Sequence, residues 1–348
     1  MQTEPTETFS VRTSDGVEIR LRRYRGGSKG PVLVAHGAGV SSGMFALTTV
    51  EKPFVEYLRD HGYDTWLLDW RASTELPLRQ FTLDEAAEMD FPAAARFVKE
   101  KTGAPSIQAV VHCAGASTFF MSLAAGFVPE VRSVVCSQVA LHADAPAPTQ
   151  WKALLRLPDV LQRLDIASMS PDEDPRHPRF QNALGDIVDL VHHECASTVC
   201  HRITFMYGHL YRHDQLNSAT HDRLNEQFGP CNMTTFRHLA QIVRRGSSAK
   251  FDYGKVENQR RYGTPEPPSY VHAEHLKLPI LFVSGALNQT YLPSSTERTY
   301  SWLCKENGAS LYRREVVPHY GHIDGFLGYR AERDTFPLFL SHLEATAS

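Results

Sequence analysis

Short apolar segments alternate with amphipathic segments at both ends of this 348-residue chain. This alternation limits the folds that the chain can adopt. The apolar segments have the length and composition of buried strands, and the segments between them have helical spacing. Such alternation predicts an α/β fold, in which helices cover both faces of a mostly parallel sheet. Strands are expected at 30–37, 63–70, 106–113, 131–140, 278–285 and 310–322, and helices at 44–62, 83–103, 114–127, 295–308 and 331–346.

The alternation stops between residues 145 and 270, where strand signals are few and histidine and aromatic residues are frequent. We interpret this stretch as a cap inserted into a core formed by residues 1–144 and 271–348. A chain of this length is compatible with one domain that carries an insertion. A β-hairpin turning at Ser14, Asp15 and Gly16 is expected at the start of the core.

Composition excludes several classes of function. The net charge of −3 and the charged fraction of 22% give no basis for binding nucleic acid or an anionic membrane. The first residues lack the basic and apolar regions of a signal peptide, and no apolar run reaches membrane-spanning length. Six scattered cysteines do not form a disulfide scaffold. We therefore expect a soluble, cytoplasmic protein with reduced thiols.

Four polar or glycine-rich features follow predicted strands, at the edge where open α/β sheets place their sites. They are the loop His36-Gly37-Ala38-Gly39, the V-H-C-A-G stretch centred on Cys113, the loop GALNQTYLP at 285–293, and His322 in the turn PHYGHIDG. The loop GAGVSSG lacks the glycine spacing of a dinucleotide fingerprint, and no phosphate loop is present. The sequence therefore predicts no cofactor.

The order of these four features resembles the α/β-hydrolase plan of oxyanion loop, nucleophile elbow, acid and histidine. Within that superfamily the chain is most similar to the acid-lipase group, whose cap pattern of H-x-x-Q, F-D-Y-G, Asn and Tyr has counterparts within 238–263. The cysteine in the elbow and the G-H-I-D-G turn also resemble polyhydroxyalkanoate synthases. Hydrolase-like segments fused to some bacterial cholesterol-oxidase-type proteins look similar as well.

The resemblance implies that Cys113 is the nucleophile and His322 the general base. A sharp turn before a helix would hold the Cys113 thiol above the sheet, and the helix dipole and a histidine would favour the thiolate. Val111 replaces the first glycine of the usual elbow, which indicates a slightly altered turn. His36 is expected to shape the oxyanion loop. His112 is expected to point away from the site, because neighbouring strand residues face opposite sides.

Asn288 stands where acid lipases carry the aspartate that orients the histidine. With a serine nucleophile such a change costs about 10⁴-fold in turnover, whereas Cys-His-Asn is a working combination. Asp324 and Asp69 are alternative carboxylates for this role. The backbone N–H groups of Ala38 and Ala114 are the expected oxyanion donors.

The stretch HHECASTVCH at 192–201 contains two cysteines flanked by histidines, as some zinc sites do. A C-x₄-C spacing within one helix would place the thiols on different faces, and no second pair of ligands follows at a usual spacing. We therefore expect these residues to pack within the cap and assign no metal ligand, with a metal site as the less favoured alternative.

These features predict an enzyme that acts on the ester or thioester carbonyl of a fairly large, apolar small-molecule acyl substrate, by hydrolysis or acyl transfer. One alternative is a lyase that eliminates a carboxylate such as acetate from an acylated natural-product intermediate, for example a spirotetronate precursor. There His322 would abstract a proton, the oxyanion donors would hold an enolate, and Cys113 would line the pocket or act as a weak acid. Another alternative is a non-catalytic binding protein. The sequence leaves the substrate, the acceptor and the oligomeric state open.

Overall fold

A computed structural model describes residues 2–172 and 194–347 of the chain. Its centre is an eight-stranded sheet with the order β1-β2-β4-β3-β5-β6-β9-β10, which is antiparallel at β1, β2 and β4 and parallel from β4 onward. This arrangement confirms the predicted α/β class. The strands are β1 (Glu7–Arg12), β2 (Glu18–Tyr24), β3 (Lys29–Ala35), β4 (Tyr63–Asp69), β5 (Ile107–His112), β6 (Val131–Ser137), β9 (Ile280–Gly285) and β10 (Tyr312–Val317).

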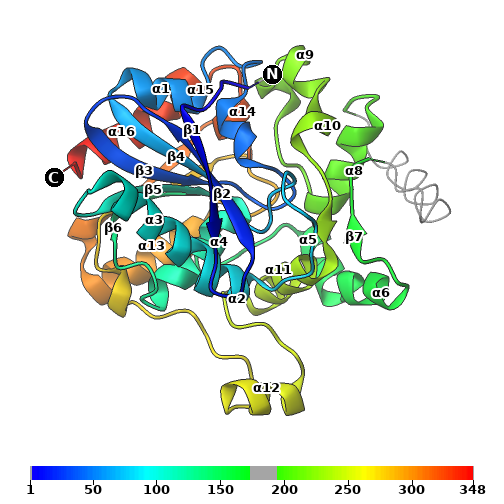
Figure 1. Cartoon of the computed structure of the whole chain (residues 1–348). Coiled ribbons are helices and arrows are strands. Elements are labelled where there is room, and N and C mark those ends of the chain that lie inside the picture. The colour runs from blue at the N-terminus through cyan, green and yellow to red at the C-terminus, as the bar shows by residue number, and fades with distance from the viewer. Residues whose placement is uncertain (1, 173–193, 348) are drawn as a thin grey trace.

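Helices cover both faces of the sheet, as Figure 1 shows, and each face buries its own hydrophobic core. Successive strand residues point to opposite faces, so Val110 joins one core and Val111 the other. One core packs against α3 (Phe91–Thr102), α4 (Cys113–Ala124) and α13 (Ser294–Asn307). The other packs against α1 (Phe54–Asp60), α14 (Asp324–Leu327), α15 (Ala331–Asp334) and α16 (Phe336–Ala345).

Local signals explain where several elements begin and end. The predicted hairpin forms, with Gly16 at φ +84° between β1 and β2. The segment expected as one helix at 44–62 divides at Pro53 into the short η1 (Ser42–Ala46) and α1. The helix expected at 83–103 starts at α2 (Leu83–Glu85) in a capping box with Thr82, passes through the π-helical η2 (Ala86–Asp90) and ends at the left-handed Gly103.

Among the described residues, the middle of the chain is mostly helical. Its described elements are α5 (Ala147–Leu154), α6 (Leu157–Arg163), β7 (Ser168–Met169), α8 (Thr198–Tyr207), η3 (His213–Gln215), α9 (Ser218–His221), α10 (Leu224–Gln227), β8 (Cys231–Asn232), α11 (Met233–Arg245), α12 (Lys255–Tyr262) and η4 (Glu274–Leu276). Nearer the C-terminus, η5 (Ala309–Leu311) follows α13. Figure 1 shows α5, α6, α8, α10 and α11 gathered at one side of the sheet, with α12 extending away from the body. The division into a core and a cap at residues 145 and 270 stays a prediction.

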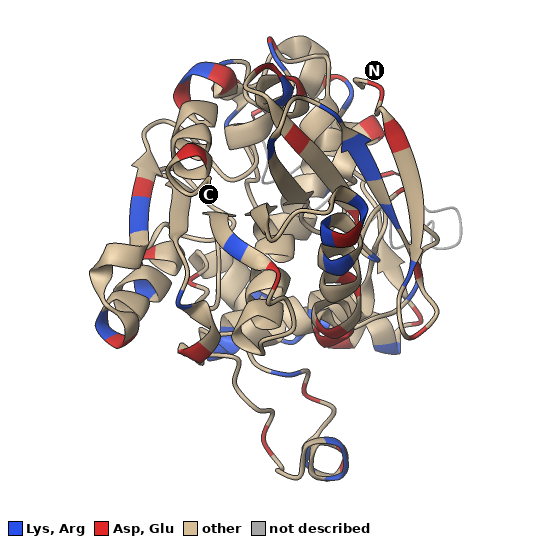
Figure 2. Ribbon diagram, turned by 60° about the vertical axis from the view of Figure 1, so that its left-hand side comes forward, with Lys and Arg blue, Asp and Glu red and all other residues tan. Residues whose placement is uncertain are grey.

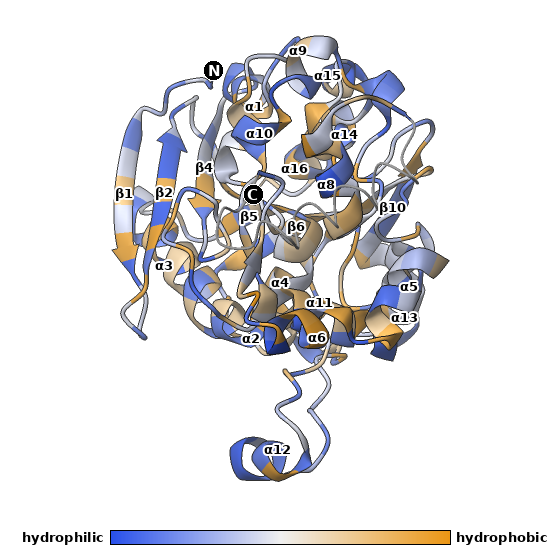
Figure 3. Ribbon diagram, turned by 90° about the vertical axis from the view of Figure 1, so that its right-hand side faces the viewer, coloured by the Kyte–Doolittle hydropathy of each residue, from blue (hydrophilic) through white to orange (hydrophobic). Residues whose placement is uncertain are grey.

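The residues that resemble the acid-lipase cap pattern hold the base of the α12 arm by hydrogen bonds. The Gln241 amide donates to the Lys250 carbonyl and accepts from the Asp252 N–H, at 2.7 and 2.8 Å. Asn258 accepts from the Tyr253 N–H at 2.9 Å, and Tyr262 donates to the Phe251 carbonyl at 3.0 Å. The pattern therefore shapes backbone in this region, and α12 itself is mostly hydrophilic (Figure 3).

Acidic and basic residues alternate along the ribbon in Figure 2, in keeping with the nearly balanced charge of the sequence. Among the described residues, no helix combines the length and the apolar character that crossing a bilayer requires.

Candidate active site

Cys113 occupies the turn between β5 and α4, as the sequence predicts. It is the first residue of α4 and has φ +57°, a left-handed conformation that a residue with a side chain adopts only at an energetic cost. Gly115 makes the turn possible, because a Cβ there would lie 2.1 Å from the His36 carbonyl oxygen. Val111 is fully buried within β5, so the strand accommodates a side chain where the usual elbow has glycine.

The Cys113 sulfur lies against the two predicted oxyanion donors. The backbone N–H groups of Ala38 and Ala114 both donate hydrogen bonds to Sγ. Gly37 brings the loop this close, because a Cβ at Gly37 would lie 2.7 Å from the Cβ of Cys113. Burial nevertheless outweighs these hydrogen bonds and raises the pKa of the Cys113 thiol to about 11. The resting residue is therefore a neutral thiol, in contrast to the thiolate that the helix dipole suggested.

His322 follows the last strand and faces the same space. A ring nitrogen of His322 and the Cys113 sulfur lie within 4.8 Å of each other. His322 Nδ1 is 3.2 Å from Asn288 Oδ1, and Nε2 has no hydrogen-bond partner among the described residues. Burial lowers the pKa of His322 to about 3, so the imidazole is neutral at pH 7. The structure thus brings together Cys113, His322 and Asn288.

The hydrogen bonds of Asn288 determine which way its amide faces. Its Oδ1 accepts from the backbone N–H groups of Thr290 and Tyr291 at 2.9 and 3.1 Å, which only an oxygen can do. Its Nδ2 donates to Gln138 Oε1 at 2.9 Å. Because Oδ1 is an acceptor, His322 must carry its proton on Nδ1 and direct the lone pair of Nε2 into the site. The neutral Asn288 therefore selects the tautomer that a general base needs.

Gln138 is a site residue that the sequence reasoning missed. It follows β6 directly and has φ +82°, and its Oε1 also accepts from the Gly285 N–H at 3.1 Å. Its position after a strand of the sheet is the same signal that identified Cys113 and His322. Nothing in its residue type distinguished it from an ordinary turn residue.

The two alternative carboxylates have other partners. Asp324 Oδ2 accepts from the backbone N–H groups of Gly321 and Arg212, at 2.8 and 3.3 Å, and so braces the loop that carries His322. Burial raises the pKa of Asp324 to about 6. Asp69 lies under the oxyanion loop, where it accepts from the Ser42 N–H at 2.8 Å and pairs with Arg22 at 3.3 Å. Arg71 pairs with Asp90 at 2.7 Å and with Asp15 at 3.0 Å.

Two other histidines lie beside the site. His36 is fully buried in the oxyanion loop, with Nδ1 2.7 Å from the Gly37 carbonyl oxygen. His112 lines the same pocket as Cys113, and its ring centre is 5.0 Å from that of His322. The expectation that His112 points away is wrong, because the left-handed turn at Cys113 ends the alternation of strand faces. His319 lies beyond the end of β10, which is shorter than expected, and does not line the pocket.

The pocket above Cys113 and His322 is predominantly apolar. Its floor is formed by Cys113, His112, His322 and the oxyanion loop, and its walls come from α5, α6, α8 and α11. The middle region of the chain thus covers the carboxyl ends of the strands. Prominent apolar side chains of the walls are Leu157, Leu161, Phe205, Met206, Phe236 and Leu239.

An eight-stranded, mostly parallel sheet with a strained residue after β5 and a histidine after its last strand is the architecture of α/β hydrolases. A model of the α/β-hydrolase fold family matches residues 30–329. The chain belongs to this family.

Its relatives include lipases, in agreement with the resemblance found in the sequence. Human lipase member K is 23% identical over 95% of this chain and 86% of its own length, and triacylglycerol lipase 1 of Arabidopsis thaliana is 24% identical over 97% and 86%. A thermophilic esterase from Thermogutta terrifontis has a similar structure, with a TM-score of 0.58 and 13% identity over 99% of this chain and all of the esterase. That structural likeness supports the fold alone.

Proposed function

We propose that this chain is an ester or thioester hydrolase, or an acyltransferase, that uses Cys113 as its nucleophile. The observation that carries the proposal is the position of the Cys113 sulfur. It is held at a strained turn, hydrogen-bonded by two converging N–H groups, and lies within 4.8 Å of a ring nitrogen of His322. A nucleophile, a base with its tautomer selected and two oxyanion donors are the parts that acyl transfer requires.

Cys113 and His322 are both neutral at rest, so the first step must transfer the thiol proton to the histidine. A rotation about the Cys113 Cα–Cβ bond moves the sulfur out of the oxyanion site and toward His322 Nε2. The thiol proton passes to Nε2 as sulfur attacks the carbonyl carbon, and the carbonyl oxygen takes the place of sulfur between the N–H groups of Ala38 and Ala114. Collapse of the tetrahedral intermediate expels the alcohol or thiol, which takes the proton from His322, and leaves an acyl-cysteine.

The acyl-cysteine is a thioester, so water or another nucleophile can resolve it. His322 deprotonates the incoming group, and the cysteine leaves and regains its proton. The names of the lipase relatives support an ester as the substrate, and the apolar walls support an apolar acyl or alcohol part.

The experiment is mass spectrometry of the intact protein after brief reaction with p-nitrophenyl esters and acyl thioesters of increasing chain length. We expect an acyl adduct that maps to Cys113, is absent from Cys113→Ala, and accumulates with a burst of p-nitrophenol. Cys304→Ser is a matched control that retains the adduct. Absence of an adduct together with full activity of Cys113→Ala overturns the proposal.

A carboxylate-eliminating lyase is distinguished by its product. The eliminated carboxylate and an alkene would form, and no oxygen from ¹⁸O-labelled water would enter either product. The acyl-cysteine route places one labelled oxygen in the released acid. An unlabelled acid with an alkene would therefore contradict acyl transfer.

A further inference from the structure

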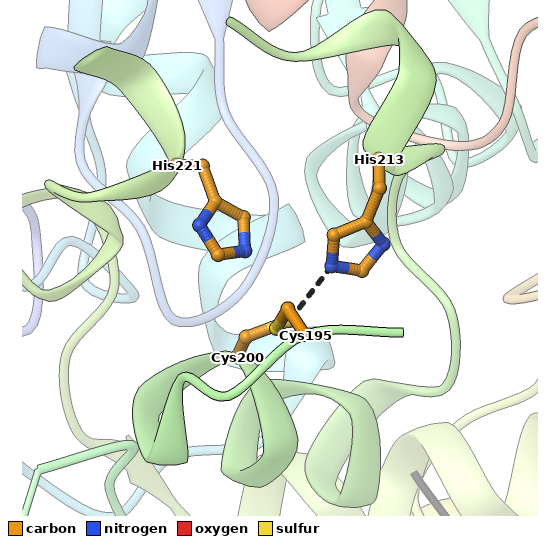
Figure 4. Close-up of side chains that lie close together, drawn as sticks. All are labelled: Cys195, Cys200, His213 and His221. Carbon is orange, nitrogen blue, oxygen red and sulfur yellow. Dashed lines mark hydrogen bonds between the residues drawn. The ribbon is translucent and has the colours of Figure 1, made fainter. Parts of the chain in front are cut away.

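A second cluster of cysteine and histidine side chains lies in the middle region of the chain. Cys195, Cys200, His213 and His221 each direct a ligand-type atom into one space, and these four atoms lie within 4.8 Å of one another. Figure 4 shows that the side chains come from α8, α9, η3 and the segment before α8. They are separate from the pocket above Cys113, which none of the four lines.

The structure removes both arguments against a metal at these cysteines. Cys195 precedes Ser197, the N-cap of α8, so the two thiols are not fixed on different faces of one helix. A second pair of ligands does exist, because η3 and α9 bring His213 and His221 back to the cysteines. His192 and His193, which also drew attention in the sequence, lie outside the described residues.

We propose that Cys195, Cys200, His213 and His221 form a tetrahedral zinc site. Two thiolates and two imidazoles are a common ligand set of structural zinc, with bond lengths of about 2.3 Å to sulfur and about 2.0–2.1 Å to nitrogen. Those lengths place sulfur and nitrogen ligands roughly 3.6 Å apart in a tetrahedron. Cys200 Sγ and His213 Nε2 are 3.4 Å apart, so this pair already has the spacing of two zinc ligands.

The surrounding groups match those around metal-bound histidine and cysteine. Glu194 Oε2 lies 2.7 Å from His213 Nδ1, so a carboxylate orients the ring with Nε2 toward the cysteines. Tyr211 donates its hydroxyl proton to Cys200 Sγ at 2.9 Å, which favours a thiolate. His201 Nε2 is 2.7 Å from the Cys195 carbonyl oxygen and holds the segment that carries Cys195.

The two cysteine sulfurs and the two imidazoles lie close enough together for one ion to contact all four. A divalent cation between the side chains stabilises both thiolates and removes their mutual repulsion.

Four protein ligands close the coordination shell, so the role of the ion is structural. Cys200 and His213 flank residues 208–212, which contact the loop of His322. The Leu210 carbonyl accepts from the N–H groups of His322 and Ile323 at 3.1 and 2.7 Å. Zinc at this site would fix α8, which supplies Phe205 to the pocket wall, and the support of the His322 loop.

The test is the metal content of the full chain, produced with a histidine-free tag and measured by mass spectrometry after removal of loosely held metal. We expect about one zinc ion per chain in wild type and less than about a tenth in Cys195→Ser/Cys200→Ser. X-ray absorption should show sulfur near 2.3 Å and nitrogen near 2.0 Å in equal numbers. Cys113→Ser and Cys304→Ser should keep their zinc, because neither thiol belongs to the cluster.

Two substitutions of His221 distinguish loss of zinc from loss of folding. His221→Cys provides the Cys₃His set that structural zinc sites also use, and it should retain zinc, whereas His221→Ala should lose it. Circular dichroism checks that each variant is folded. The proposal is overturned if reduced, metal-free wild type takes up no zinc, if the double serine variant keeps its zinc, or if X-ray absorption detects no sulfur ligand.

Discussion

Two clusters of cysteine and histidine in this molecule contain similar side chains but are surrounded by opposite partial charges. His112, Cys113 and His322 converge beside the sheet, and Cys195, Cys200, His213 and His221 converge in the middle region. At the first cluster, backbone N–H groups face the Cys113 sulfur, and such dipoles favour negative charge and disfavour a cation. At the second, Glu194 faces His213, and a carboxylate behind a histidine favours a cation.

The two clusters also differ in their access and number of ligands. The first opens into an apolar pocket, and the Nε2 atom of His322 is directed into that site. The second provides four ligands and leaves no position for a substrate. Residue type alone therefore does not separate a nucleophile from a metal ligand, whereas the dipoles and charges around the sulfur do.

Removal of the Cys113 thiol tests whether the two clusters are independent. Cys113→Ala should lower kcat for ester hydrolysis by about 10⁶-fold, because loss of the nucleophile leaves only the oxyanion donors and binding. The zinc content of this variant should equal that of wild type. Steady-state kinetics and metal analysis on one preparation measure both. A parallel loss of zinc would contradict the separation of the two sites.

The next prediction tests whether Cys113 and Asn288 form one functional unit. In the Cys113→Ser background, Asn288→Asp should raise kcat by about 10³-fold, because a serine nucleophile needs a carboxylate to stabilise the imidazolium. In wild type the same substitution should not raise kcat, since a thiol nucleophile works with a neutral amide that already orients His322. A double-mutant cycle measures the coupling. Equal effects of Asn288→Asp in both backgrounds would refute it.

The third prediction concerns the carboxylate of the second cluster. Glu194→Gln should weaken zinc binding by about 10- to 100-fold, because outer hydrogen-bond partners hold and polarise metal-bound histidines. Competition with a chromophoric chelator measures the affinity. Glu226→Gln, on the nearby α10, is a control that should leave the affinity unchanged. Unchanged affinity in Glu194→Gln would show that this carboxylate does not support the histidine.

Much of the fold and three residues of the candidate site could be predicted from the sequence. Most buried strands were located to within a few residues, because an apolar run between turn residues is a local signal. Cys113, His322 and Asn288 were also found, since parallel strands end at one edge of the sheet and the residues after them meet there. The last strand was predicted too long, because Val317 is followed directly by a loop in which His319 has φ +65°.

Other parts were not predictable, for identifiable physical reasons. His112 was placed on the wrong side, because strand alternation does not continue through a left-handed residue. Gln138 contributes through an amide whose partners, Asn288 and Gly285, are distant in sequence. His213 and His221 belong to short helical turns without a periodic pattern, so their approach to the cysteines depends on tertiary packing.

The smallest effect on activity is expected at Asp324, which distinguishes a bracing carboxylate from a catalytic one. Asp324→Asn should change kcat/KM by less than about threefold, because an amide oxygen can still accept from the Gly321 and Arg212 N–H groups. A large loss of activity, with the variant folded and Asn288→Asp tolerated, would instead assign the acid role to Asp324.

The Asp324→Asn substitution should change the free energy of unfolding more than it changes activity. Because burial raises the pKa of this carboxyl from 3.8 to about 6, the folded chain binds its proton more tightly than the unfolded chain does. This proton binding stabilises the fold fully below pH 3.8, and the stabilisation is lost as pH rises through 6. The loss amounts to about 3 kcal/mol by pH 7. Asp324→Asn removes this loss, so its unfolding free energy should fall less than that of wild type between pH 4 and pH 7. Urea unfolding across that range measures the difference, and Asp60→Asn, at an exposed ion pair, is the control that should follow wild type.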